Sequence, residues 1–211
     1  MKNQFFGDNR DLFKYDLIQH IIQGIKEIDK FSFVPMLTRN SGTHGNQVER
    51  QKAKAGKYNY NLINYLDKCI LENRRNITEI IKYYKQIGIS TFIYRESTYF
   101  VKSLRRDYFN SIPESFLKNS LILVYPDNIL QVKKSKEEHI LYIDIKKLYD
   151  SMNDNASLMI FQYFSRECHD NYTAKRRDEL FNITKEVPSI ISDNVIMYLF
   201  LTKKIILNNI C

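Results

Sequence analysis

The feature that most constrains the fold is an uninterrupted apolar run, LILVY at residues 121–125, which ends at the turn signal Pro126-Asp127-Asn128. A short apolar run with little alternation, bounded by turn residues, is typical of a strand that is buried on both faces. Such strands belong mainly to parallel sheets that helices cover on both sides. We therefore expect an α/β domain in which this strand is central.

Segments with strand and helix patterns alternate along the rest of the chain. Apolar spacing and turn residues predict strands at 31–38, 90–97, 157–164, 195–201 and 205–210, and helices at 9–28, 58–86 (two, separated at 73–76), 98–112, 136–152 and 172–186. The helix at 136–152 is favoured by a capping-box pattern, Ser135 with Glu138, and by apolar residues at helical spacing. A strand, a helix and a strand in succession make a right-handed crossover with parallel strands. The expected fold is a single Rossmann-like α/β domain over residues 1–211, with three layers, a mostly parallel sheet and a C-terminal strand hairpin.

Composition sets limits on the class of protein. With 211 residues, 44% of them apolar and 27% charged, the chain has the balance of one globular domain. No run approaches the roughly 18 to 20 apolar residues of a membrane span, and the start lacks a signal-peptide pattern. We expect a cytoplasmic protein with no membrane partner. The cysteines, Cys69, Cys168 and Cys211, are odd in number and far apart, which predicts free thiols rather than disulfides or a zinc site.

The formal charge of +8 favours anionic partners, such as a nucleic acid or a nucleotide, because a basic face attracts phosphate groups. Chains rich in Lys, Asn and Ile are also basic through composition alone. Charge by itself therefore leaves both interpretations open.

Polar residues follow several of the predicted strands, at the edge of the sheet where open α/β folds bind ligands. Asp127 and Asn128, directly after the central strand, are the candidate catalytic residues. The loop after the first strand contains Gly42 among small polar residues, and glycine lets backbone N–H groups approach a ligand. Its spacing matches neither GxGxxG nor GxxxxGK[ST]. The further candidates are Thr38, Asn40, Gly42 and Glu96 for a cofactor, and Gln162 and Arg166 for a substrate.

Five short segments resemble a family of bacterial and phage proteins related to the three-Cys-motif partner proteins, a methyltransferase-like group. The segments are FGDNRDLFKYDLI (6–18), FVPMLT (33–38), YRES (94–97), VYPDN (124–128) and FQYFSR (161–166), and they span most of the chain. The resemblance implies a methyltransferase-like Rossmann domain that binds a nucleotide-type ligand at the strand carboxyl ends. It also implies S-adenosylmethionine as a candidate cofactor and nucleic acid as a candidate substrate.

Two positions depart from the family pattern. Tyr125 stands where the family has Asp before the proline, and Ile129 stands where it has Gly. In amino-methyltransferases a DPPY-type turn presents groups to the target amine at this point, so the missing carboxylate weakens a catalytic role. The loop after Thr38 also lacks the compact glycine motif expected for S-adenosylmethionine. A non-enzymatic basic binding or partner domain with a vestigial pocket therefore stays open.

A different chemistry would also use Asp127. Pro126-Asp127 followed by Asp144-Ile145-Lys146 fits the pattern of a PD-(D/E)XK nuclease, in which Asp127 and Asp144 would bind Mg²⁺ and Lys146 would position the attacking water. The pattern requires Asp144 and Lys146 on a strand, where both point to one face. On a helix they lie about 200° apart. The helix predicted at 136–152 therefore disfavours the nuclease.

Overall fold

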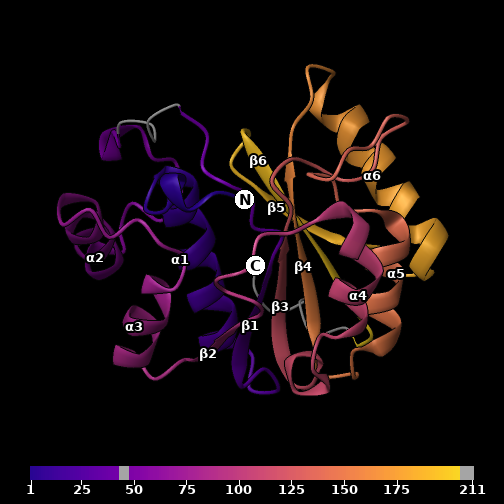
Figure 1. The fold of residues 1–211 in the computed structure, drawn as a ribbon, viewed down its shortest axis with the longest axis horizontal. Coiled ribbons are helices and arrows are strands. Elements are labelled where there is room, and N and C mark those ends of the chain that lie inside the picture. Colours follow the sequence, from indigo (N-terminus) through magenta and orange to yellow (C-terminus); the bar gives the residue numbers. More distant parts are fainter. Residues whose placement is uncertain (43–47, 205–211) are drawn as a thin grey trace.

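One six-stranded sheet organises the protein (Figure 1). The computed structural model describes residues 1–42 and 48–204. The strand order is β2-β1-β3-β4-β6-β5. The strands are β1 (Lys30–Pro35), β2 (Ser90–Ile93), β3 (Ser120–Tyr125), β4 (Ser157–Tyr163), β5 (Ser189–Ser192) and β6 (Ile196–Thr202). The apolar run at 121–125 thus lies in β3, between β1 and β4, as predicted.

The sheet is mixed. β1 pairs in parallel with both β2 and β3, and β3 pairs in parallel with β4. β6 runs antiparallel to β4 and to β5. The predicted mostly parallel sheet is therefore correct for the first four strands and not for the C-terminal pair. The hairpin of the described residues joins β5 to β6, and the predicted strand at 205–210 lies outside those residues. Sequence patterns missed β5, since SIIS is too short for a clear alternation.

Helices cover both faces of the sheet (Figure 1). On one side lie α1 (Asn9–Gly24), α2 (Tyr60–Leu71) and α3 (Glu79–Gln86), and on the other lie α4 (Arg105–Asn110), α5 (Tyr142–Ser151) and α6 (His169–Thr184). Short 3-10 helices are η1 (Asn3–Phe5), η2 (Arg50–Lys52), η3 (Lys102–Leu104) and η4 (Glu114–Leu117). Along β3, Leu121, Leu123 and Tyr125 pack in the core under α1–α3, and Ile122 and Val124 pack in the core under α4–α6. This alternation, with every residue buried, explains the apolar run.

Helix α1 begins close to the carboxyl edge of the sheet. The side chain of Asp8 caps it by accepting from the backbone N–H groups of Arg10 and Asp11, both at 2.9 Å. The preceding Gly7 has φ +89°, a conformation that glycine adopts without strain. The helix ends at Gly24 because Ile25 is already extended, so it is shorter than the predicted 9–28.

The predicted helix at 136–152 is wrong in its first half, because α5 begins only at Tyr142. Ser135 does not cap a helix. Its hydroxyl accepts from the N–H of Val132 and donates to the carbonyl of Val132, which closes a local turn. Asp144 takes the capping role instead, by accepting from the N–H of Leu141 at 3.0 Å. The predicted helix at 98–112 is likewise reduced to η3 and α4, and α6 starts at His169 rather than at 172.

Two further predictions concern the thiols and the membrane. Cys69 and Cys168 are free thiols, as predicted, and Cys211 lies outside the described residues. Among residues 1–42 and 48–204, none of the helices combines the length and apolar character needed to cross a bilayer.

Candidate functional site

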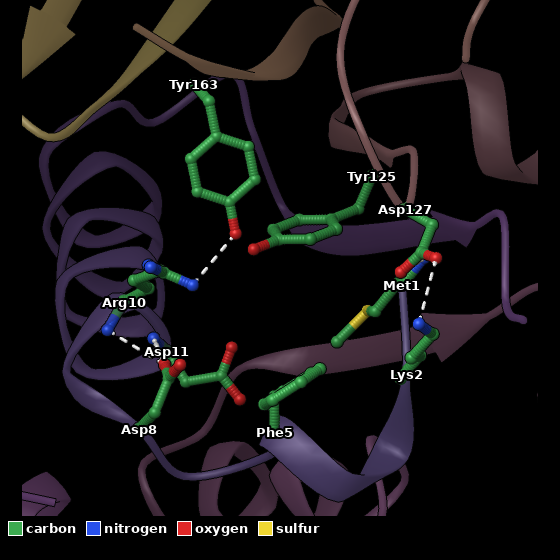
Figure 2. A pocket seen from close by; sticks show the side chains of 9 residues that line it. All are labelled: Met1, Lys2, Phe5, Asp8, Arg10, Asp11, Tyr125, Asp127 and Tyr163. Atoms are coloured by element: carbon green, nitrogen blue, oxygen red, sulfur yellow. Dashed lines mark hydrogen bonds and ion pairs between the residues drawn. The ribbon is translucent and has the colours of Figure 1, made fainter. Parts of the chain in front are cut away.

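A cavity of about 190 Å³ lies at the carboxyl ends of β3 and β4, beside the first turn of α1 and the N-terminal segment (Figure 2). From β1 the chain continues to β2 on one side, whereas β3 lies on the other side of β1. The edge between β1 and β3 is therefore the topological switch point of the parallel strands. We call this cavity the Asp127 pocket; its lining residues are Met1, Lys2, Phe5, Asp8, Arg10, Asp11, Tyr125, Asp127 and Tyr163.

The first turn of α1 supplies charged groups to the pocket. Arg10 reaches across it, and its Nη1 donates to the hydroxyl of Tyr163, at the end of β4, at 2.9 Å (Figure 2). The carboxylate of Asp11 accepts from the N–H of Gly7 at 2.9 Å. The bond of Arg10 connects α1 to β4. Together the two bonds fix the positions of a guanidinium and a carboxylate at the pocket wall.

A fully buried lysine lies beneath this wall. Lys14 has no solvent exposure, and its Nζ lies 2.5 Å from a carboxylate oxygen of Asp11. The same ammonium lies 4.3 Å from the ring centroid of Tyr15 and 4.4 Å from that of Tyr125. Tyr125 in turn stacks on Phe161, with ring centroids 4.1 Å apart. A buried ion pair with two flanking rings thus forms the base of the pocket.

Asp8 has an unusual acidity. Burial, together with the neighbouring charge of Asp11, raises the pKa of the Asp8 carboxyl from 3.8 to about 6, against the opposing effects of the Asp11 N–H and of Arg10. A carboxyl group with a pKa near neutrality can exchange a proton under ordinary conditions.

Asp127 lies at the other end of the pocket and contacts the N-terminal segment (Figure 2). Its Oδ1 is 3.0 Å from the Met1 nitrogen and its Oδ2 is 3.7 Å from Lys2 Nζ. Burial alone would raise the pKa of Asp127, but the charge of the Met1 amino group, its hydrogen bond, a hydrogen bond from Thr38 and the charge of Lys2 lower that pKa below 3.8. Burial also lowers the pKa of the Met1 amine to about 5, so a neutral amine would contribute less to this effect. We assign the charge to Asp127, because Lys2 stabilises its ionised form independently of the Met1 amine.

Thr38 and Asn40 contact the N-terminal segment, residues 1–4, which Asp127 also contacts. The backbone N–H and the hydroxyl of Thr38 both donate to the carbonyl of Met1, at 2.7 and 3.1 Å. Asn40 accepts from the N–H of Gln4 at 3.2 Å. The structure thus brings these two predicted residues and Asp127 together around residues 1–4.

Of the predicted site residues, all of which the structure describes, Asp127 alone lines the pocket. Asn128 is exposed, and its N–H donates to the carbonyl of Glu138. Gly42 and Glu96 are exposed on loops, and Arg166 is exposed before α6. Gln162 is fully buried and accepts from the N–H of Leu130 at 2.8 Å, so it holds the loop after β3 against β4.

The residues of the nuclease pattern are held apart by α5. Asp144 forms an ion pair with Arg105, and Lys146 forms one with Asp150 at 2.8 Å. Both are helical, whereas the pattern requires a strand. Within residues 1–42 and 48–204, no group of three His, Cys, Asp or Glu side chains could hold a metal ion.

Sequence reasoning missed the α1 contribution to the pocket. Arg10, Asp11 and Lys14 lie in the helix predicted at 9–28, and Asp8 directly precedes it. The segment 6–18 also carries the family resemblance, but none of these four residues was among the predicted site residues. One signal was present, since Asp11 and Lys14 are three residues apart and neighbours on a helix surface. Lys14 is also flanked in sequence by Phe13 and Tyr15, two aromatic residues that are buried in the core.

The pocket combines carboxylates, a guanidinium and aromatic rings, a set that suits a ligand with hydrogen-bond donors, an acidic group and a flat ring. Comparisons with protein-family models, with curated proteins and with solved structures found no match.

Proposed function

We propose that this chain is a methyltransferase-like Rossmann domain that binds a nucleotide-type ligand in the Asp127 pocket, in work on nucleic acid. One observation carries the proposal. The pocket lies at the carboxyl ends of the parallel strands and beside the β1/β3 switch point, where open α/β sheets bind ligands.

The lining of the pocket suits the parts of a nucleotide. The rings of Phe5 and Tyr163 offer flat apolar surfaces to a base. The Asp8 carboxyl group can accept from ribose hydroxyls, and Arg10 can donate to a phosphate or a carboxylate. At about 190 Å³ the cavity is smaller than the roughly 300 to 1,000 Å³ of sites for drug-sized ligands. It therefore suits a nucleoside or amino-acid moiety, with the rest of the ligand outside it.

S-adenosylmethionine fits this set only in part. The carboxylates of Asp8 and Asp127 suit its cationic amino-acid end, and Arg10 suits its carboxylate. In the described part of the loop after β1, Gly42 lies in open space, because a Cβ added there would meet nothing within 4 Å. S-adenosylmethionine is therefore one of several ligands to test, and no methyl-transfer step follows from these residues.

A second candidate is a binding domain without catalysis. It is favoured by the state of Asp127, whose carboxylate already contacts Met1 and Lys2 and is thereby engaged within the chain. In this case a ligand would bind through Arg10, Asp8 and the aromatic rings, with Asp127 holding the N-terminal segment in place.

Calorimetry with S-adenosylmethionine, S-adenosylhomocysteine, adenosine and ATP tests the proposal. At least one should bind the wild type, and Arg10→Gln should weaken that binding by about ten- to a hundredfold, because a hydrogen bond to a charged group is lost. Asp127→Ala should also weaken it. Asp150→Asn, an exposed carboxylate on α5, is the matched control and should leave the affinity unchanged. Circular dichroism would verify that each variant is folded. Absence of binding by all four ligands, or unchanged affinity in both pocket variants, would refute the pocket assignment.

A further inference from the structure

A second hollow lies on the other side of the sheet, between the loop after β3 and helix α6. Its volume is about 710 Å³. We call it the α6 groove; its lining residues are Gln131, Val132, Lys133, Lys134, Tyr142, Lys175, Arg176 and Glu179. None of these residues lines the Asp127 pocket.

The α6 groove carries an excess of positive charge. It contains four cationic side chains and a single carboxylate, that of Glu179. Glu179 is already engaged, because its Oε2 accepts from both Arg176 and the hydroxyl of Tyr142. Within the part of the chain that the structure describes, none of Lys133, Lys134 and Lys175 forms an ion pair with a carboxylate. Their charges are therefore available to an anionic ligand.

Arg176 is built into the base of the groove. Its residue is only 3% exposed, and its Nη1 donates to the carbonyl of Gln131 at 3.2 Å, to Tyr142 and to Glu179, both at 2.8 Å. The guanidinium carbon lies 4.9 Å from the ring centroid of Tyr172. Its Nε is buried and lacks a hydrogen-bond partner among the described residues. Arg176 thus joins the loop after β3, Tyr142 and Glu179, and it fixes the base of the groove beneath the exposed lysines.

A comparable groove between α2 and α3 lacks this excess charge. Its cations are Lys68, Arg74 and Lys82. All three are paired, Lys68 and Arg74 with Glu72, and Arg74 and Lys82 with Glu79. Uncompensated positive charge therefore distinguishes the α6 groove from a basic surface that is neutralised within the protein.

We propose that the α6 groove binds the backbone phosphates of a nucleic-acid strand. The exposed lysines are flexible point charges that suit phosphates, and Arg176, paired with Glu179, holds the base of the groove in place. The half-buried Tyr142 and Val132 add apolar surface for a sugar or a base. This inference deepens the proposed function by assigning a surface to the nucleic acid, and it rests on that function for the choice of nucleic acid over other polyanions.

Fluorescence anisotropy with a fluorescein-labelled single-stranded oligonucleotide tests the groove. Lys134→Glu/Lys175→Glu should weaken binding about tenfold or more and should reduce the slope of log K against log salt by roughly two, one for each lost phosphate contact. Lys68→Glu/Lys82→Glu in the α2–α3 groove changes the net charge equally and is the matched control. At physiological salt, where exposed charges are screened beyond about 8 Å, it should change the affinity by less than about threefold.

Three results would overturn the proposal: no salt-dependent binding by the wild type, equal losses in both double variants, or displacement of the oligonucleotide as effectively by polyglutamate as by unlabelled oligonucleotide. The two sites are separable in the same experiments. The groove variants should keep the calorimetric affinity for the nucleotide-type ligand, and Arg10→Gln should keep the affinity for the oligonucleotide. If the wild type binds the oligonucleotide but none of the four ligands in calorimetry, the Asp127 pocket is refuted and the α6 groove stands.

Discussion

Replacing Lys14 by methionine should destabilise the protein strongly, because it removes the cation that contacts the buried carboxylate of Asp11. Lys14 is completely buried, its partner Asp11 is 5% exposed, and the charged atoms are 2.5 Å apart. At an effective dielectric constant of about 20, that separation corresponds to an attraction of about 7 kcal/mol. Desolvation of the two charges offsets much of this attraction. Removing one partner of such a pair lowers the free energy of unfolding by about 3 to 5 kcal/mol. Methionine retains most of the lysine volume, so the loss would reflect charge rather than a cavity.

Urea unfolding at pH 7 would measure this effect against two further variants. Lys146→Met breaks the exposed pair with Asp150 on α5 and should cost about 0 to 1 kcal/mol. In Lys14→Met/Asp11→Asn no charge of the pair is left uncompensated, and the introduced amide would still accept from the N–H of Gly7, so this double variant should be more stable than Lys14→Met alone. If Lys14→Met costs as little as Lys146→Met, or if the double variant is the less stable one, the ion pair does not compensate Asp11 as described.

Two further predictions concern single residues near the sheet edge. Asp8→Asn keeps an N-cap on α1 but removes the titrating carboxyl group. The pKa of Asp8 is about 6 in the folded protein, against an ordinary value of 3.8. The stability that this carboxyl group contributes is therefore fully present below pH 3.8 and is lost as the pH rises through 6. Between pH 4 and 7 the free energy of unfolding of the wild type should therefore fall by about 2 to 2.5 kcal/mol relative to that of Asp8→Asn in urea titrations, and a difference that does not vary with pH would contradict this. Gln162→Met leaves the buried N–H of Leu130 without its acceptor and should cost about 1 to 3 kcal/mol with unchanged ligand affinity, whereas lost affinity in the folded variant would restore the substrate-binding role of Gln162.

Much of the fold was predictable because it depends on periodicity. The apolar run of β3 and the helical spacing of α1, α2 and α3 report burial directly, so the central strand and the helical cover were found. The predicted helix boundary failed where local hydrogen bonds stabilise a turn instead. Ser135 closes a turn with Val132 instead of starting a helix, although its spacing to Glu138 fits a capping box. The strand order of β6 and β5 depends on pairing between distant residues, which no local pattern encodes.

The candidate site was predictable only at the strand ends. The rule for open α/β sheets selected Asp127 and Thr38, which the fold brings together. It also selected Gln162, because a position near the carboxyl end of an apolar strand does not reveal that the side chain points into the protein. The rule did not select the residues at the start of α1, because it considers residues that follow a strand, and Asp8 and Arg10 precede every strand. Their proximity to Tyr163 depends on packing across 153 positions of sequence.

The insertion of β6 between β4 and β5 has a consequence for how the chain folds. β4 can pair with β3 early, but its other edge stays open until Ile196–Thr202 has left the ribosome. β4 is apolar, without charge and without proline, the composition that makes exposed strand edges prone to aggregate. The nascent protein therefore carries an unpaired strand edge until β6 has been synthesised, and this reversed strand also protects β4 from intermolecular pairing.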